Sequence, residues 1–372
     1  MKEMAGRAAG FAMMLGALGF ASALKAENPN DYKPKFGGHI EAWYKQDNGE
    51  LSRSSGAVNN TFRIRRARLT AGGNITDDLT YRLQGSYEGT TAALIDAYIE
   101  QKLKPWLRVG GGQYKTLLCL EATESFFAMP FVLRSDVIEK HVGTLGRTGG
   151  AYRDIGVYAK VAFPDRMGFN FTGGAVNGNG LRAVDINDTK DLWGKIELNP
   201  LQGVLLGVSG FKGRNENKGE AMVKNENLYA AHMEYRPAHF SGLRLRSEFL
   251  RAQYGNTKST ATPSTSVEPY GYYVAVVYRV PAVKPSSEPN SGWEYAYRWE
   301  RYNVNRRATS PAWVTNHTLG ATHRYHNDNR LRFNYIFRSA DSGVTASTDI
   351  QENGVTSGKI GGLFLAQYIV GF

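Results

Sequence analysis

Four arginines stand within six consecutive positions in segment 62–69, FRIRRARL. A guanidinium keeps its positive charge at every relevant pH, and its planar fork of N–H groups matches the oxygens of phosphate and carboxylate. Alternate residues of a strand face opposite sides, so Arg66 and Arg68 share one face. Arg65 lies on the other face unless a β-bulge near Ile64 turns the strand. The segment therefore predicts an anion-binding surface.

Further basic residues lie on the same predicted faces of other strands. They outnumber the acidic residues there by about three to two. Positive charge in a narrow channel with low-dielectric walls concentrates anions. Each basic residue could instead pair with a carboxylate across the interior and stiffen the wall, so both roles stay open for single positions. For the cluster as a whole we favour anion contact, and the additional candidates are Arg82, Arg108, Arg244, Arg246 and Arg298.

Strands must position these side chains, and a period of two divides the chain into about sixteen of them. Their connections alternate between short turns and longer loops, which is typical of outer-membrane barrels. We therefore predict an all-β fold, a transmembrane antiparallel β-barrel. The expected strands are 38–46, 61–72, 79–88, 94–103, 106–115, 152–163, 168–176, 191–198, 204–211, 227–236, 243–254, 270–280, 293–302, 313–326, 330–338 and 359–372.

The final segment, GGLFLAQYIVGF, puts Phe364, Ala366, Tyr368 and Phe372 on one face of a strand. No residue follows that could supply the next strand, so the segment is expected to pair with the first strand and close the barrel. An aromatic last residue after alternating apolar positions resembles the C-terminal insertion signal of outer-membrane barrels.

The longest stretch without a clear strand is 116–150, and its middle contains FFAMPFVL at 126–133. An apolar loop of this length is better suited to packing against a barrel wall than to lying in water. We expect it to fold inward and narrow the lumen as a constriction loop.

Residues 1–26 read as a secretory signal peptide, with a basic start, an apolar stretch and small residues near its end. Cleavage after Ala23 or after Ala26 is expected, where the second site is the weaker match but leads into a polar start, and the barrel domain is 27–372. The expected destination is the bacterial outer membrane, with its lipid around the barrel. Export makes a nucleic-acid partner implausible although the full chain has a net charge of +11.

The sequence shows no motif for metal binding, for a phosphate-binding loop or for a catalytic nucleophile. His317, His323 and His326 do not have the spacing of a metal site on a helix, and Gly110–Gly112 is not followed by a helix that would make a phosphate loop. No cofactor or metal is expected, and the lone Cys119 is interpreted as a packing residue. An outer-membrane hydrolase is the rival from the enzyme class, but no nucleophile motif supports it.

Four segments, FRIRRARLTAGGNITDDLTYRLQ (62–84), DAYIEQKLKPWLRVGGGQYK (96–115), CLEATES (119–125) and YRDIGVYAKVAF (152–163), resemble the phosphate- and polyphosphate-selective porins, the porin O and P family. The resemblance implies a homotrimer of sixteen-stranded barrels whose arginine ladder conducts small anions. It places Arg65, Arg66 and Arg68 in the ladder and Lys115 at the strand end that leads into the constriction loop. A general, weakly selective porin is the alternative.

Overall fold

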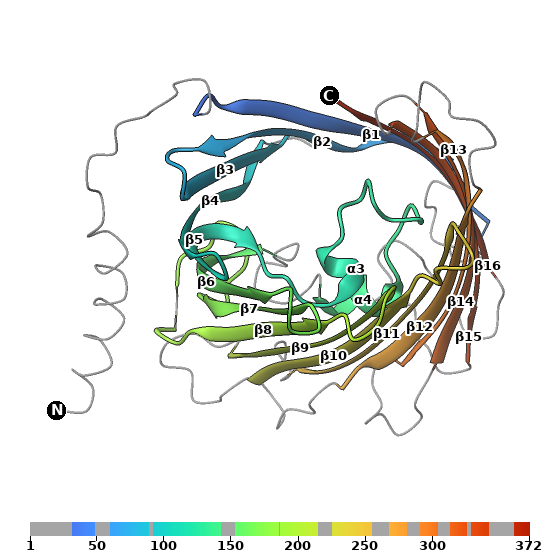
Figure 1. Ribbon diagram of the computed structural model, residues 1–372. Helices are drawn as coiled ribbons and strands as arrows, with labels where there is room; N and C mark the ends of the chain where they lie inside the picture. Colours follow the sequence, from blue (N-terminus) through green and yellow to red (C-terminus); the bar gives the residue numbers. More distant parts are fainter. Residues whose placement is uncertain are drawn as a thin grey trace, which may run out of the picture.

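The computed structural model describes residues 32–48, 60–88, 92–142, 153–185, 187–214, 225–254, 268–280, 291–303, 313–325, 329–341 and 361–372. Within them, sixteen antiparallel strands form a closed barrel (Figure 1). Each strand pairs with the next along the chain, and the last pairs with the first. This confirms the predicted barrel, while the predicted signal peptide lies outside the described residues.

The strands follow the predicted ranges closely. They are β1 (Lys35–Asp47), β2 (Asn60–Asn74), β3 (Leu79–Ser86), β4 (Ala93–Lys104), β5 (Leu107–Lys115), β6 (Arg153–Phe163), β7 (Phe169–Val176), β8 (Asp191–Leu198), β9 (Val204–Arg214), β10 (Asn225–Tyr235), β11 (Leu243–Tyr254), β12 (Tyr270–Arg279), β13 (Gly292–Asn303), β14 (Trp313–Tyr325), β15 (Asn329–Ala340) and β16 (Gly361–Gly371). Two short helices, α3 (Leu120–Thr123) and α4 (Asp136–Val142), lie between β5 and β6.

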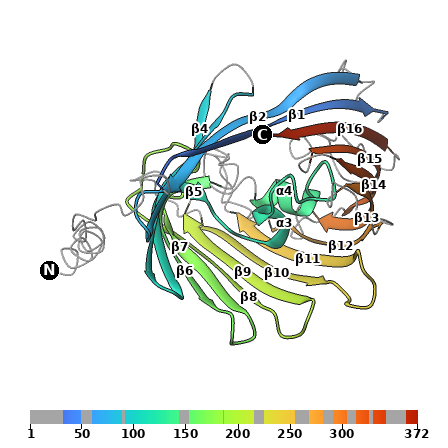
Figure 2. The ribbon, with the colours of Figure 1, turned by 45° about the horizontal axis from the view of Figure 1, so that its top comes forward.

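The barrel closes between β1 and β16, which lie side by side in Figure 2. Their pairing ends at Gly38, whose amide donates to the carbonyl of Phe372 at 2.9 Å and whose carbonyl accepts from the Phe372 amide at 3.1 Å. Leu365 and Ile369 of β16 are buried on the inner side, while Tyr368 is exposed on the outer side. The alternating segment thus closes the barrel as its pattern predicted.

The outer surface is apolar, as expected of a wall that faces lipid. Val208, Val274 and Val276 are among its exposed apolar side chains. Aromatic rings gather near both rims, as in the stacked pair Trp106 and Phe163 beside a short turn and the pair Tyr270 and Trp313 at the opposite rim. No helix of the described residues has the length and apolar composition to cross a membrane.

The segment between β5 and β6 enters the barrel, and α3 and α4 lie inside the ring of strands (Figure 1). Its apolar residues Leu118, Phe131 and Ile138 join one buried cluster with inward-facing side chains of β10 to β15, such as Leu250 and Tyr273. The prediction of an inward-folding loop is therefore confirmed. The described part of this constriction loop is 116–142.

Candidate functional site

The constriction loop divides the interior into two unequal halves. One face of the loop is bound to the strands β9 to β15. Cys119 donates its amide hydrogen to Ser209 Oγ of β9 at 3.1 Å, and Val132 donates to Asn334 Oδ1 of β15 at 2.7 Å. The opposite face borders a cavity of about 940 Å³ whose wall is formed by strands β1 to β8. The open passage through the barrel therefore lies between the loop and β1 to β8.

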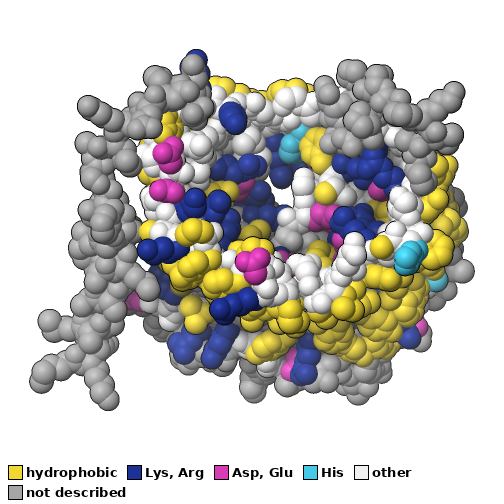
Figure 3. Space-filling view, viewed as in Figure 1, with side chains coloured by type: hydrophobic (Ala, Val, Ile, Leu, Met, Phe, Trp, Pro, Cys, Tyr) yellow, Lys and Arg dark blue, Asp and Glu magenta, His cyan; other side chains and the backbone are white. Residues whose placement is uncertain are grey.

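Basic side chains dominate this passage. Figure 3, which looks along the barrel, shows Lys and Arg side chains around the opening. Eight basic and four acidic side chains line the cavity. The basic ones are Arg65, Arg66, Arg68, Arg82, Lys115, Arg134, Arg153 and Lys160, and the acidic ones are Glu88, Asp96, Glu124 and Glu139.

A β-bulge in β2 turns its arginines toward the lumen. Glu41 of β1 pairs in register with Arg66, whereas the next residue, Ala42, pairs with Ile64. Arg65 is therefore the additional residue, and two successive side chains face the same side. The sequence left a bulge near Ile64 as one possibility; the structure contains it, and it allows Arg65, Arg66 and Arg68 to line one cavity.

The β2 arginines are held in different ways. The guanidinium of Arg65 lies 5.1 Å from the centre of the Trp43 ring. Arg66 is buried, and it donates to Glu41 Oε2 at 2.7 Å. Among the described residues the Arg68 guanidinium has no direct hydrogen-bond or ion-pair partner, and its Nε is buried without one. Arg68 is thus the β2 arginine whose charge is most available to a passing ion.

Lys115 lies close to several other positive charges. In the pairing of β5 with β6 it stands directly opposite Arg153. Arg68 and Arg134 are also near enough to interact with it electrostatically. Like charges placed opposite one another destabilise a sheet, so this group of side chains favours the presence of an anion.

Carboxylates offset part of this positive charge. Asp96 accepts from Arg153 Nε at 2.6 Å and lies 3.4 Å from Arg82 Nε. Glu88, just beyond the end of β3, is partly buried, which opposes its ionisation. Hydrogen bonds from Ser86 Oγ and the Ala67 amide, together with the charge of Arg68, outweigh that effect and hold the pKa of Glu88 below its usual value.

Arg108 does not line the main cavity. It borders a smaller cavity of about 220 Å³ together with Asn74, Asp78 and Lys102, beside the short turn between β2 and β3. Its Nη1 donates to Glu100 Oε1 at 3.2 Å, and Glu100 also accepts from Lys160 Nζ at 2.6 Å. Arg108 and Lys160 thus share the single carboxylate of Glu100.

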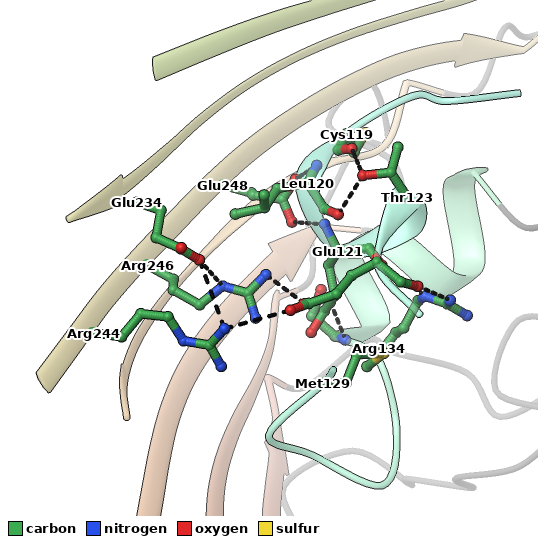
Figure 4. A network of polar contacts seen from close by, with 12 residues as sticks. Cys119, Leu120, Glu121, Thr123, Met129, Arg134, Glu234, Arg244, Arg246 and Glu248 are labelled. Atoms are coloured by element: carbon green, nitrogen blue, oxygen red, sulfur yellow. Dashed lines mark hydrogen bonds and ion pairs between the residues drawn. The ribbon is translucent and has the colours of Figure 1, made fainter. Parts of the chain in front are cut away.

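Arg244, Arg246 and Arg298 lie on the opposite side of the loop from the passage. Figure 4 shows Arg244 and Arg246 beside Glu234 and the loop. Arg246 Nη2 lies 2.7 Å from Glu124 of the loop, and Arg298 Nη1 donates to Glu121 at 3.0 Å. Their guanidinium groups bind the loop to the wall, and they are absent from the lining of the main cavity.

Arg134 and Arg153 are lining residues that the sequence did not single out. Arg134 belongs to the loop, whose path cannot be read from a strand pattern. Arg153 is the first residue of β6 and pairs with Lys115, the last residue of β5. The expected pairing of β5 with β6 could therefore have identified Arg153 from the sequence. Phe126 of the loop was noted only as apolar. It faces β2, and its ring contacts Arg66.

The histidines of β14 lie against aromatic side chains of the wall. His317 Nδ1 is 2.8 Å from the hydroxyl of Tyr297, and the His323 ring centre is 4.9 Å from that of Trp293. His326 lies outside the described residues. The described residues contain no group of three or more metal-ligating side chains that could hold an ion.

A family model described as "Phosphate-selective porin O and P" matches residues 39–248, more than half of the chain. Among solved structures, an anion-selective porin from Comamonas acidovorans is 12% identical, with a TM-score of 0.68, and the match covers 91% of this chain and 99% of that one. OmpF of Salmonella typhi, in complex with daunomycin, is 12% identical with a TM-score of 0.65 over 92% and 99% of the two chains. The trimer form of OmpT, an outer membrane protein of Vibrio cholerae, is 11% identical with a TM-score of 0.62 over 91% and 99%. A comparison with curated proteins gives no match.

Proposed function

The chain belongs to the phosphate-selective porin O and P family and is a channel of the bacterial outer membrane, and we propose that it conducts anions in preference to cations by passive diffusion. The preferred substrates in this proposal are phosphate and polyphosphate. The passage between the constriction loop and β1 to β8 is the route.

The main support for this proposal is the twofold excess of basic over acidic side chains around the passage. Water in a narrow channel with low-dielectric walls screens fixed charge poorly, so a positive lining raises the local concentration of anions and lowers that of cations. The solved anion-selective porin has the same barrel fold, and this similarity supports the proposal without extending to individual residues.

Phosphate suits the basic side chains that border the passage. The Arg68 guanidinium has no hydrogen-bond or ion-pair partner among the described residues and can present its N–H groups to phosphate oxygens, while Lys115, Arg134 and Arg153 add positive charge near it. A polyphosphate could contact successive members of this group. The preference for phosphate rests on this chemistry and on the family description.

The ion pairs in the passage favour a second candidate, a general and weakly selective pore. Glu41 offsets the charge of Arg66, while Asp96 lies beside both Arg82 and Arg153. These pairs reduce the net positive charge of the passage, whereas Arg68 makes no ion pair with the described residues. The two candidates differ in their response to phosphate.

Reconstitution in a planar bilayer tests both. In a KCl gradient the reversal potential should have the sign of an anion-preferring channel, and added phosphate should reduce the chloride current by occupying the passage. An anion-preferring potential without any effect of phosphate supports the general pore. A cation-preferring potential overturns the anion proposal.

Two parts of the proposal concern maturation and assembly. We propose removal of residues 1–26 as a signal peptide, with cleavage after Ala23 or Ala26, because the segment combines a basic start, an apolar stretch and small residues. N-terminal sequencing of the protein from outer membranes distinguishes the two sites. A homotrimer is proposed from the family and can be measured by mass in detergent.

A further inference from the structure

Two buried glutamates on the wall behind the constriction loop bind the loop at the starts of its two helices. Neither Glu248 of β11 nor Glu300 of β13 lines the passage, and each is only 1% exposed. We propose that Glu248 and Glu300 are positioning residues that set the width of the passage by holding the constriction loop away from β1 to β8. This proposal applies to any ion that the channel conducts.

Glu248 binds the first residues of α3. One carboxylate oxygen accepts the amide hydrogen of Leu120, and the other accepts that of Glu121 at 3.0 Å (Figure 4). The hydroxyl of Tyr273 on the neighbouring strand also donates to Glu248 at 2.7 Å. Backbone amides at the start of a helix have no partner within that helix, so the wall carboxylate satisfies groups that would otherwise be buried unpaired.

Glu300 binds the start of α4 in the same manner. Its Oε2 accepts the amide hydrogen of Asp136, the first residue of α4, at 3.2 Å. Asn316 of β14 donates through Nδ2 both to Glu300 and to Asp136 Oδ2. Arg298 Nε lies 3.4 Å from Glu300 Oε2 and partly compensates this buried charge.

Glu121 of the loop connects the two attachment points. Its amide donates a hydrogen bond to Glu248. Its carboxylate accepts one, at 2.7 Å, from the amide of Ser135, the residue before α4. Its carbonyl oxygen accepts from Arg134 Nε at 2.9 Å. Because Arg134 lines the passage on the other face of the loop, loss of either wall carboxylate should be transmitted to the passage.

The test compares Glu248→Gln and Glu300→Gln with a matched control, Glu294→Gln. The amide keeps the size of the side chain but replaces one acceptor by an N–H donor and removes the charge. Glu294 is also a buried wall carboxylate, but it accepts a hydrogen bond from Arg324 of β14 at 2.8 Å and does not bind the described part of the loop. Its substitution should leave the constriction unchanged.

Single-channel recording in a planar bilayer is the first measurement. Glu248→Gln and Glu300→Gln should each raise the time spent in a second conductance level about tenfold, because a buried hydrogen bond to a charged group contributes free energy of that order. Steady conductance equal to that of the parent in both variants would overturn the proposal. So would failure of both to form heat-modifiable barrels, because the carboxylates would then be needed for the barrel itself.

The thiol of Cys119 provides a second readout that does not depend on ion flow. Cys119 precedes Leu120, is fully buried, and is the one cysteine of the chain. N-ethylmaleimide should label it slowly in folded parent and in Glu294→Gln, and much faster in folded Glu248→Gln. Equal protection in all three proteins would show that Glu248 does not hold this part of the loop.

Discussion

The guanidinium carbon of Arg66 lies 3.4 Å from the centre of the Phe126 ring, which joins the constriction loop to β2. The guanidinium carbon of Arg134 lies 3.9 Å from the same centre. Two guanidinium groups this close to one ring would overlap on a single face, so they lie on opposite faces. Phe126 is thus held between a wall arginine and a loop arginine at the edge of the passage.

Replacing Phe126 by Ala should widen the passage. The substitution removes two cation–π contacts, which together stabilise this position of the loop by about 2 kcal/mol. It also leaves Arg66 and Arg134 facing one another. We expect a larger single-channel conductance with anion preference retained. Phe169→Ala, at an aromatic cluster of the rim, is the control and should leave conductance unchanged.

Reversing the charge of Arg66 and Arg68 together, as Glu, should reduce or reverse anion preference. Both side chains line the passage, so the change acts where screening by solvent is weak. Arg68→Glu alone should account for most of the effect on phosphate block, because Arg66 is already paired with Glu41. The measurement is the reversal potential in a KCl gradient, followed by added phosphate.

Arg166→Glu is the control for this charge reversal. Arg166 lies in the exposed turn between β6 and β7, where solvent screens its charge within roughly 8 Å at physiological salt. Selectivity should change little. If phosphate blocks the Arg66/Arg68 double variant as well as it blocks the parent, the anion is bound elsewhere on the wall.

Deleting Phe372 should impair assembly of the barrel. The deletion removes both hydrogen bonds between Phe372 and Gly38 and the terminal aromatic ring of β16. Unheated parent protein should migrate as a heat-modifiable trimer in detergent, and the truncated chain should give much less of this species. Normal insertion and trimer yield without Phe372 would contradict the role of the last strand.

Gly38→Val should also impair assembly of the barrel, because Gly38 is the β1 residue that pairs with Phe372. A Cβ atom at Gly38 would lie 2.6 Å from the Arg68 carbonyl oxygen and 2.7 Å from the Phe372 ring, so the strands would have to move. Gly210→Val, where the nearest atom is 3.9 Å from the Cβ position, is the control. Heat-modifiability on gels compares the folded fractions.

Anion preference should rise as pH falls. The pKa of Glu88 lies below its usual value, so this carboxylate stays charged until the pH passes below the ordinary range of glutamate. Its protonation then raises the net positive charge of the passage. The stabilisation from its ionised form is present above the unfolded-state pKa and is lost as pH falls through the lowered one.

Glu88→Gln isolates this contribution. At pH 7 the variant should already show a stronger anion preference than the parent, and its reversal potential should change less between pH 7 and pH 3. Identical pH profiles for variant and parent would mean that Glu88 does not act on ions in the passage.

The amino-acid sequence determined the barrel, its strands and the inward course of the loop. A strand between lipid and lumen must alternate in polarity, and the chain shows this period from the first strand to Phe372. The same alternation required a bulge beside Ile64 if Arg65 was to face inward, and β2 contains it. The apolar segment around Phe131 had to leave water, and it packs inside the barrel.

Tertiary structure decided which basic residues border the passage. Arg68 and Arg298 both belong to barrel strands and were predicted alike as lining residues, but Arg298 meets Glu121 of the loop while Arg68 faces the cavity. That difference depends on which half of the barrel the loop occupies. The loop is held there by hydrogen bonds between residues far apart in the sequence, such as Glu248 and Leu120. Contacts between such distant residues produce no periodic pattern in the sequence, so they could not be predicted from it.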